Sequence, residues 1–145
     1  MRRAYRVALA TAAAVGVSAA LLPATAEATP GRGVTAVTIF DKVIGNTDYV
    51  LKEITLAPGG STGWHYHPGP VRAIVKQGTL THNMSDCSVD GIYRPGGFIQ
   101  EQSGPGYVHI GRNLGTTPVV LEVLYQDPVG QPLAADAPNP GCDFQ

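Results

Sequence analysis

Two histidines separated by one residue are the first side chains of this sequence that could carry chemistry. They lie in the segment Trp64-His65-Tyr66-His67. Because residues two apart in a strand point to the same face, His65 and His67 can aim both imidazole rings at one point. Neutral imidazole is a common ligand for divalent zinc, iron, manganese, nickel and copper ions. A His-x-His pair alone is weak evidence, since such pairs also occur on solvated surfaces.

The surroundings of this pair match a longer pattern. Gly59, five further residues and then His65-x-His67 reproduce the start of the first cupin motif, and Gly78 stands where that motif ends in glycine. The second cupin motif ends in Gly-x-x-His-x-x-x-Asn, which residues 106–113 match. Over residues 49–125 the sequence therefore resembles the cupin superfamily, in particular the single-domain, type-2-like cupins that bacteria export.

That resemblance implies an all-β fold, a single-domain cupin jelly-roll β-barrel. It also implies one divalent transition metal ion in the barrel mouth, held by two histidines of the first motif and one of the second, here His65, His67 and His109. Asn113, which follows the last histidine, would shape the local turn. The alternative is a barrel that keeps the scaffold and binds an organic ligand without a metal.

One expected ligand is absent from the first motif. Cupins usually supply a glutamate three or four residues after the second histidine, and these positions hold Val71 and Arg72. Val71, which cannot coordinate a metal, is the better match when residues are counted back from Gly78. Three neutral histidines would leave the ion its full positive charge, which can lower the pKa of bound water toward about 7.

Glu101 and His82 are the candidates to complete such a site. We expect Glu101, on the segment leading into the second motif, either at the site as a ligand or acid–base residue, or on a solvated loop. His82 shares a strand face with Leu80 and can point into the barrel, although a hydrogen-bonded core or surface position is commoner for a lone histidine. Trp64 and Tyr66 alternate with the two histidines and should pack on the opposite side.

The elements that position these residues are predicted to be strands. The 18 glycines and 12 prolines separate short apolar runs rich in Val, Ile and Thr, a pattern typical of β-sandwiches and barrels. We expect a barrel domain over residues 33–126 and an irregular tail over residues 127–145. The expected strands are 34–40, 49–56, 63–67, 71–76, 79–84, 97–100, 108–110 and 119–125.

Residues 1–26 are predicted to be a signal peptide. Three arginines precede an apolar run from Val7 to Leu22, and small residues allow cleavage after Ala26 or Ala28. The run is shorter than the ~20 residues that span a bilayer, which favours a cleaved signal over a membrane anchor. We therefore expect a secreted or extracytoplasmic protein with no membrane span after cleavage.

Charge and cysteine content narrow the possible partners. Cleavage after Ala26 removes three basic residues and leaves seven basic and eleven acidic ones, a net charge of −4. This balance, with no basic patch, argues against a nucleic-acid partner. Cys87 and Cys142 are expected to form a disulfide that ties the tail to a mid-chain loop, two free thiols being the alternative.

Two kinds of function are favoured over a third, a structural or interaction protein stabilised by its disulfide. One is a non-haem metal-dependent oxidoreductase or lyase, of the dioxygenase, decarboxylase or isomerase type, acting on a small organic molecule. An open metal coordination sphere favours it. The other is a non-catalytic extracytoplasmic module that binds a small ligand or a metal, favoured by the missing glutamate and the lack of other catalytic groups. A homodimer is possible, because cupins commonly pair through sheet edges.

Overall fold

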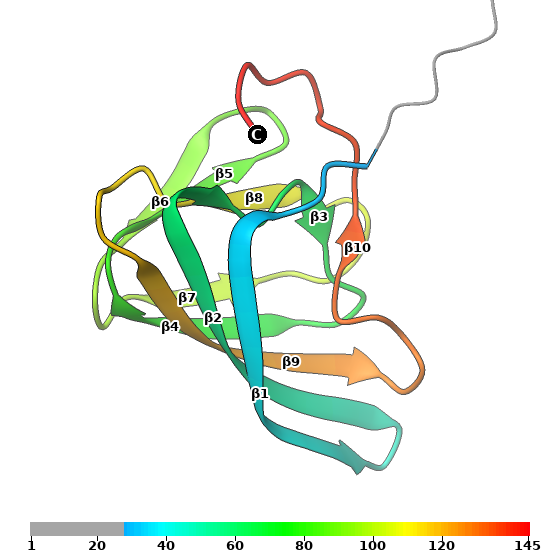
Figure 1. Ribbon diagram of the computed structural model, residues 1–145. Helices are drawn as coiled ribbons and strands as arrows, with labels where there is room; N and C mark the ends of the chain where they lie inside the picture. Colours follow the sequence, from blue (N-terminus) through cyan, green and yellow to red (C-terminus); the bar gives the residue numbers. More distant parts are fainter. Residues whose placement is uncertain (1–27) are drawn as a thin grey trace, which may run out of the picture.

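The computed structural model describes residues 28–145, and these residues form ten strands and no helix (Figure 1). None of the described segments is therefore a helix that could cross a bilayer. The predicted signal peptide lies outside the described residues. In chain order the strands are β1 (Arg32–Ile44), β2 (Thr47–Ser61), β3 (His65–Tyr66), β4 (Val71–Gln77), β5 (Leu80–Met84), β6 (Val89–Tyr93), β7 (Phe98–Glu101), β8 (His109–Arg112), β9 (Val119–Pro128) and β10 (Ala135–Asp136).

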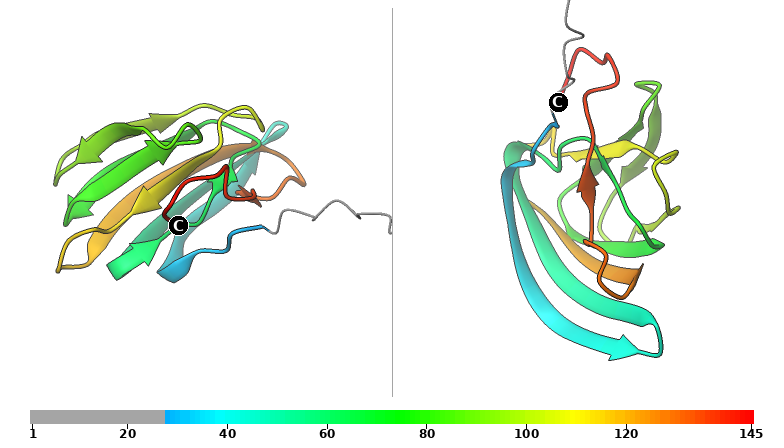
Figure 2. Two further views of the ribbon diagram at one scale, coloured as in Figure 1. Left: turned by 90° about the horizontal axis from the view of Figure 1, so that it is seen from above. Right: turned by 90° about the vertical axis from the view of Figure 1, so that its right-hand side faces the viewer.

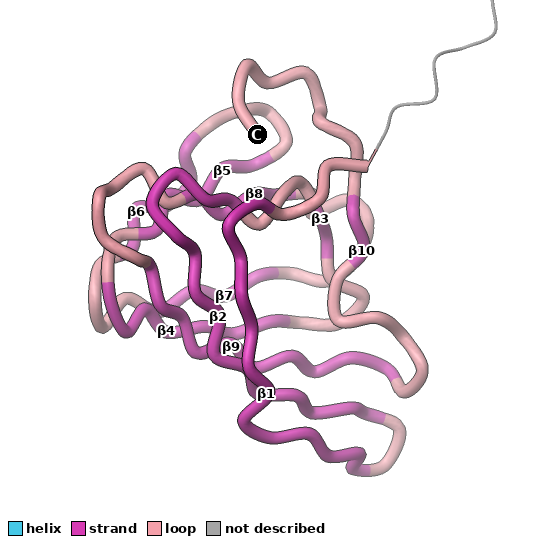
Figure 3. The backbone as a smooth tube through the Cα atoms, viewed as in Figure 1, coloured by secondary structure: helices cyan, strands magenta, loops and turns pink. Residues whose placement is uncertain are grey.

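All ten strands belong to one antiparallel sheet that curls into a nearly closed barrel. The main path runs β10-β3-β8-β2-β9-β4-β7, with β1 added to β2, β5 to β8 and β6 to β5. The sheet therefore folds into two facing layers, with β2, β9, β4 and β7 in one and β3, β8, β5 and β6 in the other (Figures 1 and 3). The predicted all-β barrel is confirmed.

Alternation of side chains along the strands builds the barrel core. In β9, Val119, Leu121, Val123 and Tyr125 are buried, and the residues between them are half-buried. β4 repeats the pattern with its own buried residues. Because successive strand residues face opposite sides of a sheet, one face of each strand supplies the barrel interior. Each fully buried Val or Leu stabilises the fold by about 1.5–3 kcal/mol.

The turns around the two motifs hold the barrel mouth together. Asn113 is buried, and its side-chain amide donates hydrogen bonds to the carbonyls of Leu56 (3.0 Å) and Thr117 (2.8 Å). The backbone carbonyl of Asn113 accepts a hydrogen bond from the N–H of Gly59 at 3.0 Å. Gly59 has a φ of +74°, in the left-handed region that favours glycine. The predicted role of Asn113 in shaping this turn is confirmed.

The C-terminal segment is attached to the barrel at several points. Its strand β10 pairs with β3, so that Asp136 lies opposite His65. Phe144 stacks on the buried Trp64 with ring centroids 5.8 Å apart. The predicted disulfide between Cys87 and Cys142 is present. The segment thus contains a short strand where only irregular structure was expected, because a two-residue strand made by pairing with β3 leaves no periodic pattern in the sequence.

Strand β1 differs from the strand expected over residues 34–40. It is longer than expected, and every one of its residues is exposed. It pairs with β2 alone, and the far end of this hairpin extends beyond the rest of the barrel (Figure 2). Val37, Ile39 and Val43 are among its exposed apolar residues. β6 was not expected at all, since its sequence Val-Asp-Gly-Ile-Tyr contains glycine and is exposed along most of its length.

Candidate metal centre

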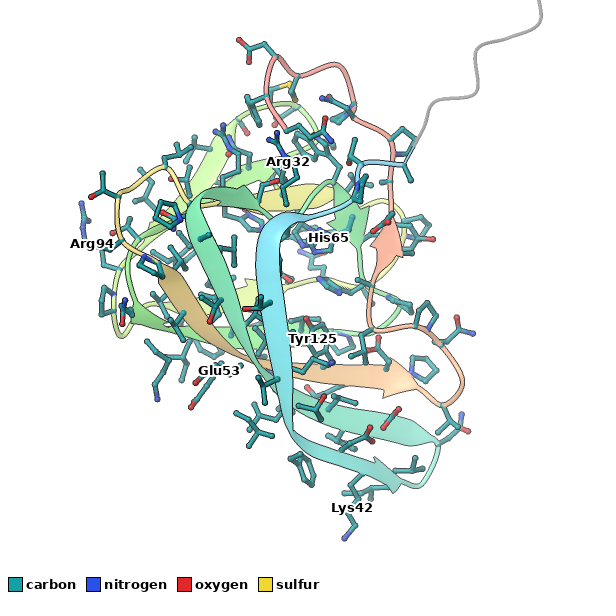
Figure 4. All side chains as sticks on the ribbon, in the orientation of Figure 1. Arg32, Lys42, Glu53, His65, Arg94 and Tyr125 are labelled. Atoms are coloured by element: carbon teal, nitrogen blue, oxygen red, sulfur yellow. A yellow bond between two sulfur atoms is a disulfide. The ribbon has the colours of Figure 1, made fainter. Side chains whose placement is uncertain are left out.

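The three predicted histidines converge inside the barrel. His65 on β3 lies directly opposite His109 on β8, and His67 follows β3 by one residue. All three side chains are buried, and one potential ligand nitrogen of each lies within 4.8 Å of the other two. The Nε2 atoms of His65 and His67 are 3.1 Å apart. Figure 4 shows His65 pointing into the barrel from the upper layer.

Backbone carbonyl groups fix which nitrogen of each ring faces the centre. The Nδ1 atoms of His65 and His109 lie 2.9 Å from the carbonyl oxygens of Gly63 and Tyr107 respectively. The Nδ1 of His67 lies 2.7 Å from the carbonyl oxygen of Leu133. A carbonyl only accepts hydrogen bonds, so each Nδ1 carries the hydrogen and each Nε2 keeps its lone pair. Three Nε2 lone pairs are thereby directed inward.

Glu101, at the end of β7, brings a carboxylate to the same point. Its Oε2 lies 3.1 Å from the Nε2 of His67 and 3.4 Å from the Nε2 of His109. Its side chain is only 13% exposed, so of the two places expected for Glu101 the structure has it at the histidine cluster rather than on a solvated loop. Glu101 pairs directly across from Val71, so a carboxylate from the neighbouring strand occupies the space next to the position where cupins carry glutamate.

His82 also reaches the cluster and is held there by Asp90. The buried His82 stacks on His109 with ring centroids 4.9 Å apart. Its Nδ1 lies 2.5 Å from Asp90 Oδ1, and its Nε2 lies 3.3 Å from Glu101 Oε1. Nothing in the sequence pointed to Asp90, because it approaches His82 only through the pairing of β5 with β6.

Burial and mutual contact set the charges of these groups. Burial, followed by the neighbouring His109 and His67, lowers the pKa of His65 to about 3, so its ring is neutral at physiological pH. Burial alone would raise the pKa of Glu101, but the histidines around it outweigh this effect and hold the pKa well below its usual value. Burial likewise lowers the pKa of His82, but Glu101 and Asp90 outweigh it and raise the pKa.

These donor atoms fit a divalent transition metal ion. Ligand atoms about 2.1 Å from one ion lie roughly 3.0–3.4 Å apart when neighbouring bonds meet at 90–109°. The measured separations of 3.1, 3.1 and 3.4 Å match this range. The Nε2 atom of His109 is buried and has no hydrogen-bond partner among the described residues. A buried lone pair without a partner is costly, and a bound cation would satisfy it.

Comparisons with known proteins agree with the architecture. No protein-family profile matches the chain, and no curated protein matches it. Among solved structures, the polyketide cyclase RemF from Streptomyces resistomycificus is 19% identical with a TM-score of 0.61, the match covering 86% of this chain and 90% of that one. A cupin-2 domain protein from Rhodospirillum rubrum is 15% identical with a TM-score of 0.57, covering 73% and 66%. The chain has the cupin fold.

A third solved structure with this cupin fold is oxalate oxidase in complex with the substrate analogue glycolate. It is 20% identical, with a TM-score of 0.54 over 66% of this chain. The match covers 51% of the oxalate oxidase chain, so this chain spans about half the length of that protein. The cupin resemblance inferred from the two glycine–histidine motifs is thus confirmed at the level of the fold.

Two spaces adjoin the histidine cluster of this cupin fold. A cavity of about 50 Å³ lies against the histidines, inside the barrel. A vestibule of about 270 Å³ adjoins it between β1 and the C-terminal segment. The two spaces share five lining residues: Ile54, Thr62, His65, His67 and Tyr125. The entrance and Tyr125 were not foreseen from the sequence, because they depend on how β10 and β1 flank the barrel mouth.

Proposed function

We propose that the protein is an exported cupin-fold protein that holds one divalent transition metal ion on His65, His67, His109 and Glu101. The observation that carries this proposal is the set of three inward Nε2 lone pairs fixed by backbone carbonyls on Nδ1. Hydrogen-bonding the second ring nitrogen in this way is how proteins orient histidine ligands for metals.

We further propose that the protein is a metal-dependent enzyme acting on a small organic molecule. When bound, the ion would polarise an oxygen-containing ligand as a Lewis acid. Glu101 adds a negative charge beside the histidines, and His82 with Asp90 holds the carboxylate in place. Leu80, Ile99 and Leu121 also line the cavity, and apolar surroundings strengthen electrostatic interactions at a site. The position of Glu101 removes the argument that a missing carboxylate favours a purely binding role.

A non-catalytic binding module for a small ligand or a metal is the second candidate. It is favoured by the absence, among residues lining the cavity, of a serine or cysteine that could act as a nucleophile. Oxygen consumption and substrate loss, measured for the metal-loaded protein on small phenols and dicarbonyls, separate the two functions. Turnover that disappears on chelation supports the enzyme, and ligand binding without turnover supports the module.

The metal proposal itself is tested by elemental analysis. All four histidines of the chain lie at this cluster. The mature protein should be purified without a histidine tag, because the tag would add metal-binding histidines elsewhere. We expect one equivalent of a divalent metal in the wild type and in Tyr66→Phe, whose ring lines neither space, and substantially less in His65→Ala. A wild-type protein that stays metal-free after incubation with zinc, iron, manganese, nickel or copper would overturn the proposal.

Export is proposed from the predicted signal peptide and is supported by the disulfide, since such bonds persist in oxidising compartments. Its test is the intact mass of protein recovered outside the cytoplasm. We expect a chain that begins at Glu27 or Thr29. Recovery of only the full-length chain from the cytoplasm would contradict export.

A further inference from the structure

The two spaces in front of the histidine cluster differ in size. The inner cavity of about 50 Å³ holds only a few water-sized groups, since one water needs roughly 10–15 Å³ by this measure. The outer vestibule is about 270 Å³, and five of its lining residues also line the inner cavity. A ligand that reaches the histidines can therefore place a head group of a few atoms inside and must keep the rest of its body in the vestibule.

The walls along this path are mostly apolar. Leu80, Ile99 and Leu121 line the inner cavity, Ile54 lines both spaces, and Val34 lines the vestibule. Ile54 thus lies where the head group of a ligand joins its body. Apolar walls stabilise an alkyl or aryl body by removing its surface from water. A charged body would lose its hydration there without gaining a hydrogen bond or an ion pair.

The charges along the path all have the same sign. Among the described residues that line either space there is no lysine and no arginine. The charged residues in the linings, apart from histidine, are Glu101 at the cluster and Asp136 in the vestibule. A ligand with one carboxylate can place it at the metal. A second carboxylate would lie against apolar side chains near Asp136, with no cation to pair with it.

Tyr125 and Thr62 supply further polar groups, and the hydroxyl of Thr62 is already hydrogen-bonded to the backbone of Gly63 and Gly111. The ring of Tyr125 lies 5.6 Å from that of His67 and lines both spaces (Figure 4). An ordinary phenol keeps its proton at physiological pH, so Tyr125 offers an O–H donor near His67 to an oxygen of a bound ligand.

We propose that the site takes small monoanionic ligands with an apolar body, anchored by one carboxylate-like oxygen group on the metal and a hydrogen bond from Tyr125, and that it discriminates against dianions. This inference rests on the proposed metal site and names its ligand class. It treats Tyr125 as a ligand-binding residue and Ile54 and Val34 as specificity-determining residues.

The test uses the full mature protein loaded with cobalt(II), whose visible spectrum reports ligand binding at the ion. The probes are acetate, butyrate and hexanoate, with adipate as the dicarboxylate of the same length as hexanoate. We expect affinity to rise about fourfold for each methylene that enters the apolar path. Adipate should bind at least about tenfold more weakly than hexanoate, because its second charge loses hydration without a partner.

Variants separate the parts of the inference. Tyr125→Phe should weaken hexanoate binding by about 2- to 10-fold, the effect of one hydrogen bond, and leave cobalt stoichiometry unchanged. Tyr66→Phe is the matched control and should bind hexanoate as the wild type does. Val34→Lys, at an exposed position on β1, should improve adipate binding by placing a cation in the vestibule.

The outcomes are distinguishable. Failure to hold cobalt overturns the proposed metal site and this inference with it. A cobalt-loaded protein that binds adipate as tightly as hexanoate, or whose affinity does not rise with chain length, overturns the ligand class alone. If Tyr125→Phe and Tyr66→Phe bind hexanoate equally well, Tyr125 has no role in ligand binding.

Discussion

Removing the disulfide should weaken both the fold and the metal site. In the Cys87→Ser/Cys142→Ser double variant, a cross-link over a sequence separation of 55 residues is lost. Loop closure of this length corresponds to about 4 kcal/mol in the chain-entropy model, with typical measured values of about 2–4 kcal/mol. For a chain of this size each kcal/mol shifts the Tm by roughly 3–5 °C, so we expect a fall of about 10–15 °C.

The effect on metal binding follows from the path of the C-terminal segment. The carbonyl of Leu133 accepts the hydrogen bond that orients His67, and β10 pairs with the strand that carries His65. Loss of such a ligand-orienting contact costs about 10- to 100-fold in metal affinity. The segment keeps other anchors, including the 2.8 Å hydrogen bond from the N–H of Ala137 to the carbonyl of Trp64, so we expect a loss of about tenfold.

Two measurements check this prediction. Thermal unfolding followed by circular dichroism gives the Tm, and competition with a chromophoric chelator gives zinc affinity at a temperature where the variant is folded. Asp143→Asn, next to Cys142 but retaining the disulfide, is the control. A decrease in Tm of less than about 2 °C would refute the loop-closure argument. Unchanged zinc affinity in a variant with a clearly lowered Tm would refute the link between the C-terminal segment and His67.

Three further predictions concern pH, the carboxylate and assembly. The pKa of His65 lies at about 3 in the folded state and near 6.5 when unfolded, so the unfolded chain binds more protons between these values. In the metal-free protein, the contribution of His65 to the free energy of unfolding should therefore be fully present above pH 6.5. It should fall by up to about 1.4 kcal/mol per pH unit on acidification toward pH 3. Urea titrations at several pH values should show a shallower fall for His65→Gln. Glu101→Gln should lower zinc affinity by at least about tenfold, because it removes a charged ligand. The control Glu122→Gln, at an outward-facing position, should leave zinc affinity unchanged. Equal zinc affinities of the two variants would show that Glu101 is not a metal ligand. The exposed, unpaired edge of β1 should pair with a second copy, so sedimentation velocity should give a dimer for the wild type and a monomer for Val37→Lys/Ile39→Lys, and a monomeric wild type would exclude this interface.

The parts of the structure that the sequence predicts well depend on local patterns. The apolar run of Val, Leu and Tyr in residues 119–125 predicts a strand, and the structure has β9 there. The resemblance of the two glycine–histidine motifs to cupins implies that His65, His67 and His109 converge, and the structure pairs His65 with His109. The disulfide was expected from cysteine number and the predicted export alone. Each of these inferences needs only a local sequence motif or, for the disulfide, the fact that the sequence has just two cysteines.

The parts that escaped prediction depend on pairings between distant strands. β10 exists because Ala135 and Asp136 meet β3, and the carbonyl of Leu133 reaches His67 for the same reason. Asp90 lies beside His82 only because β6 folds back on β5. None of these residues carries a local pattern that marks it as part of the site, since a backbone carbonyl or a single aspartate has the same sequence signature anywhere on the surface.

Glu101 illustrates why the missing ligand could not be assigned from the motif. The sequence places Val71 where cupins carry glutamate, and a count along the chain can say only that no carboxylate is there. The register of β4 with β7 sets Glu101 directly opposite Val71, and paired residues of neighbouring strands share one face of the sheet. A carboxylate can thus move from one strand to its neighbour and still reach the same histidines. What the chemistry requires is a charge at a position in space, and in a sheet that position is accessible from more than one strand.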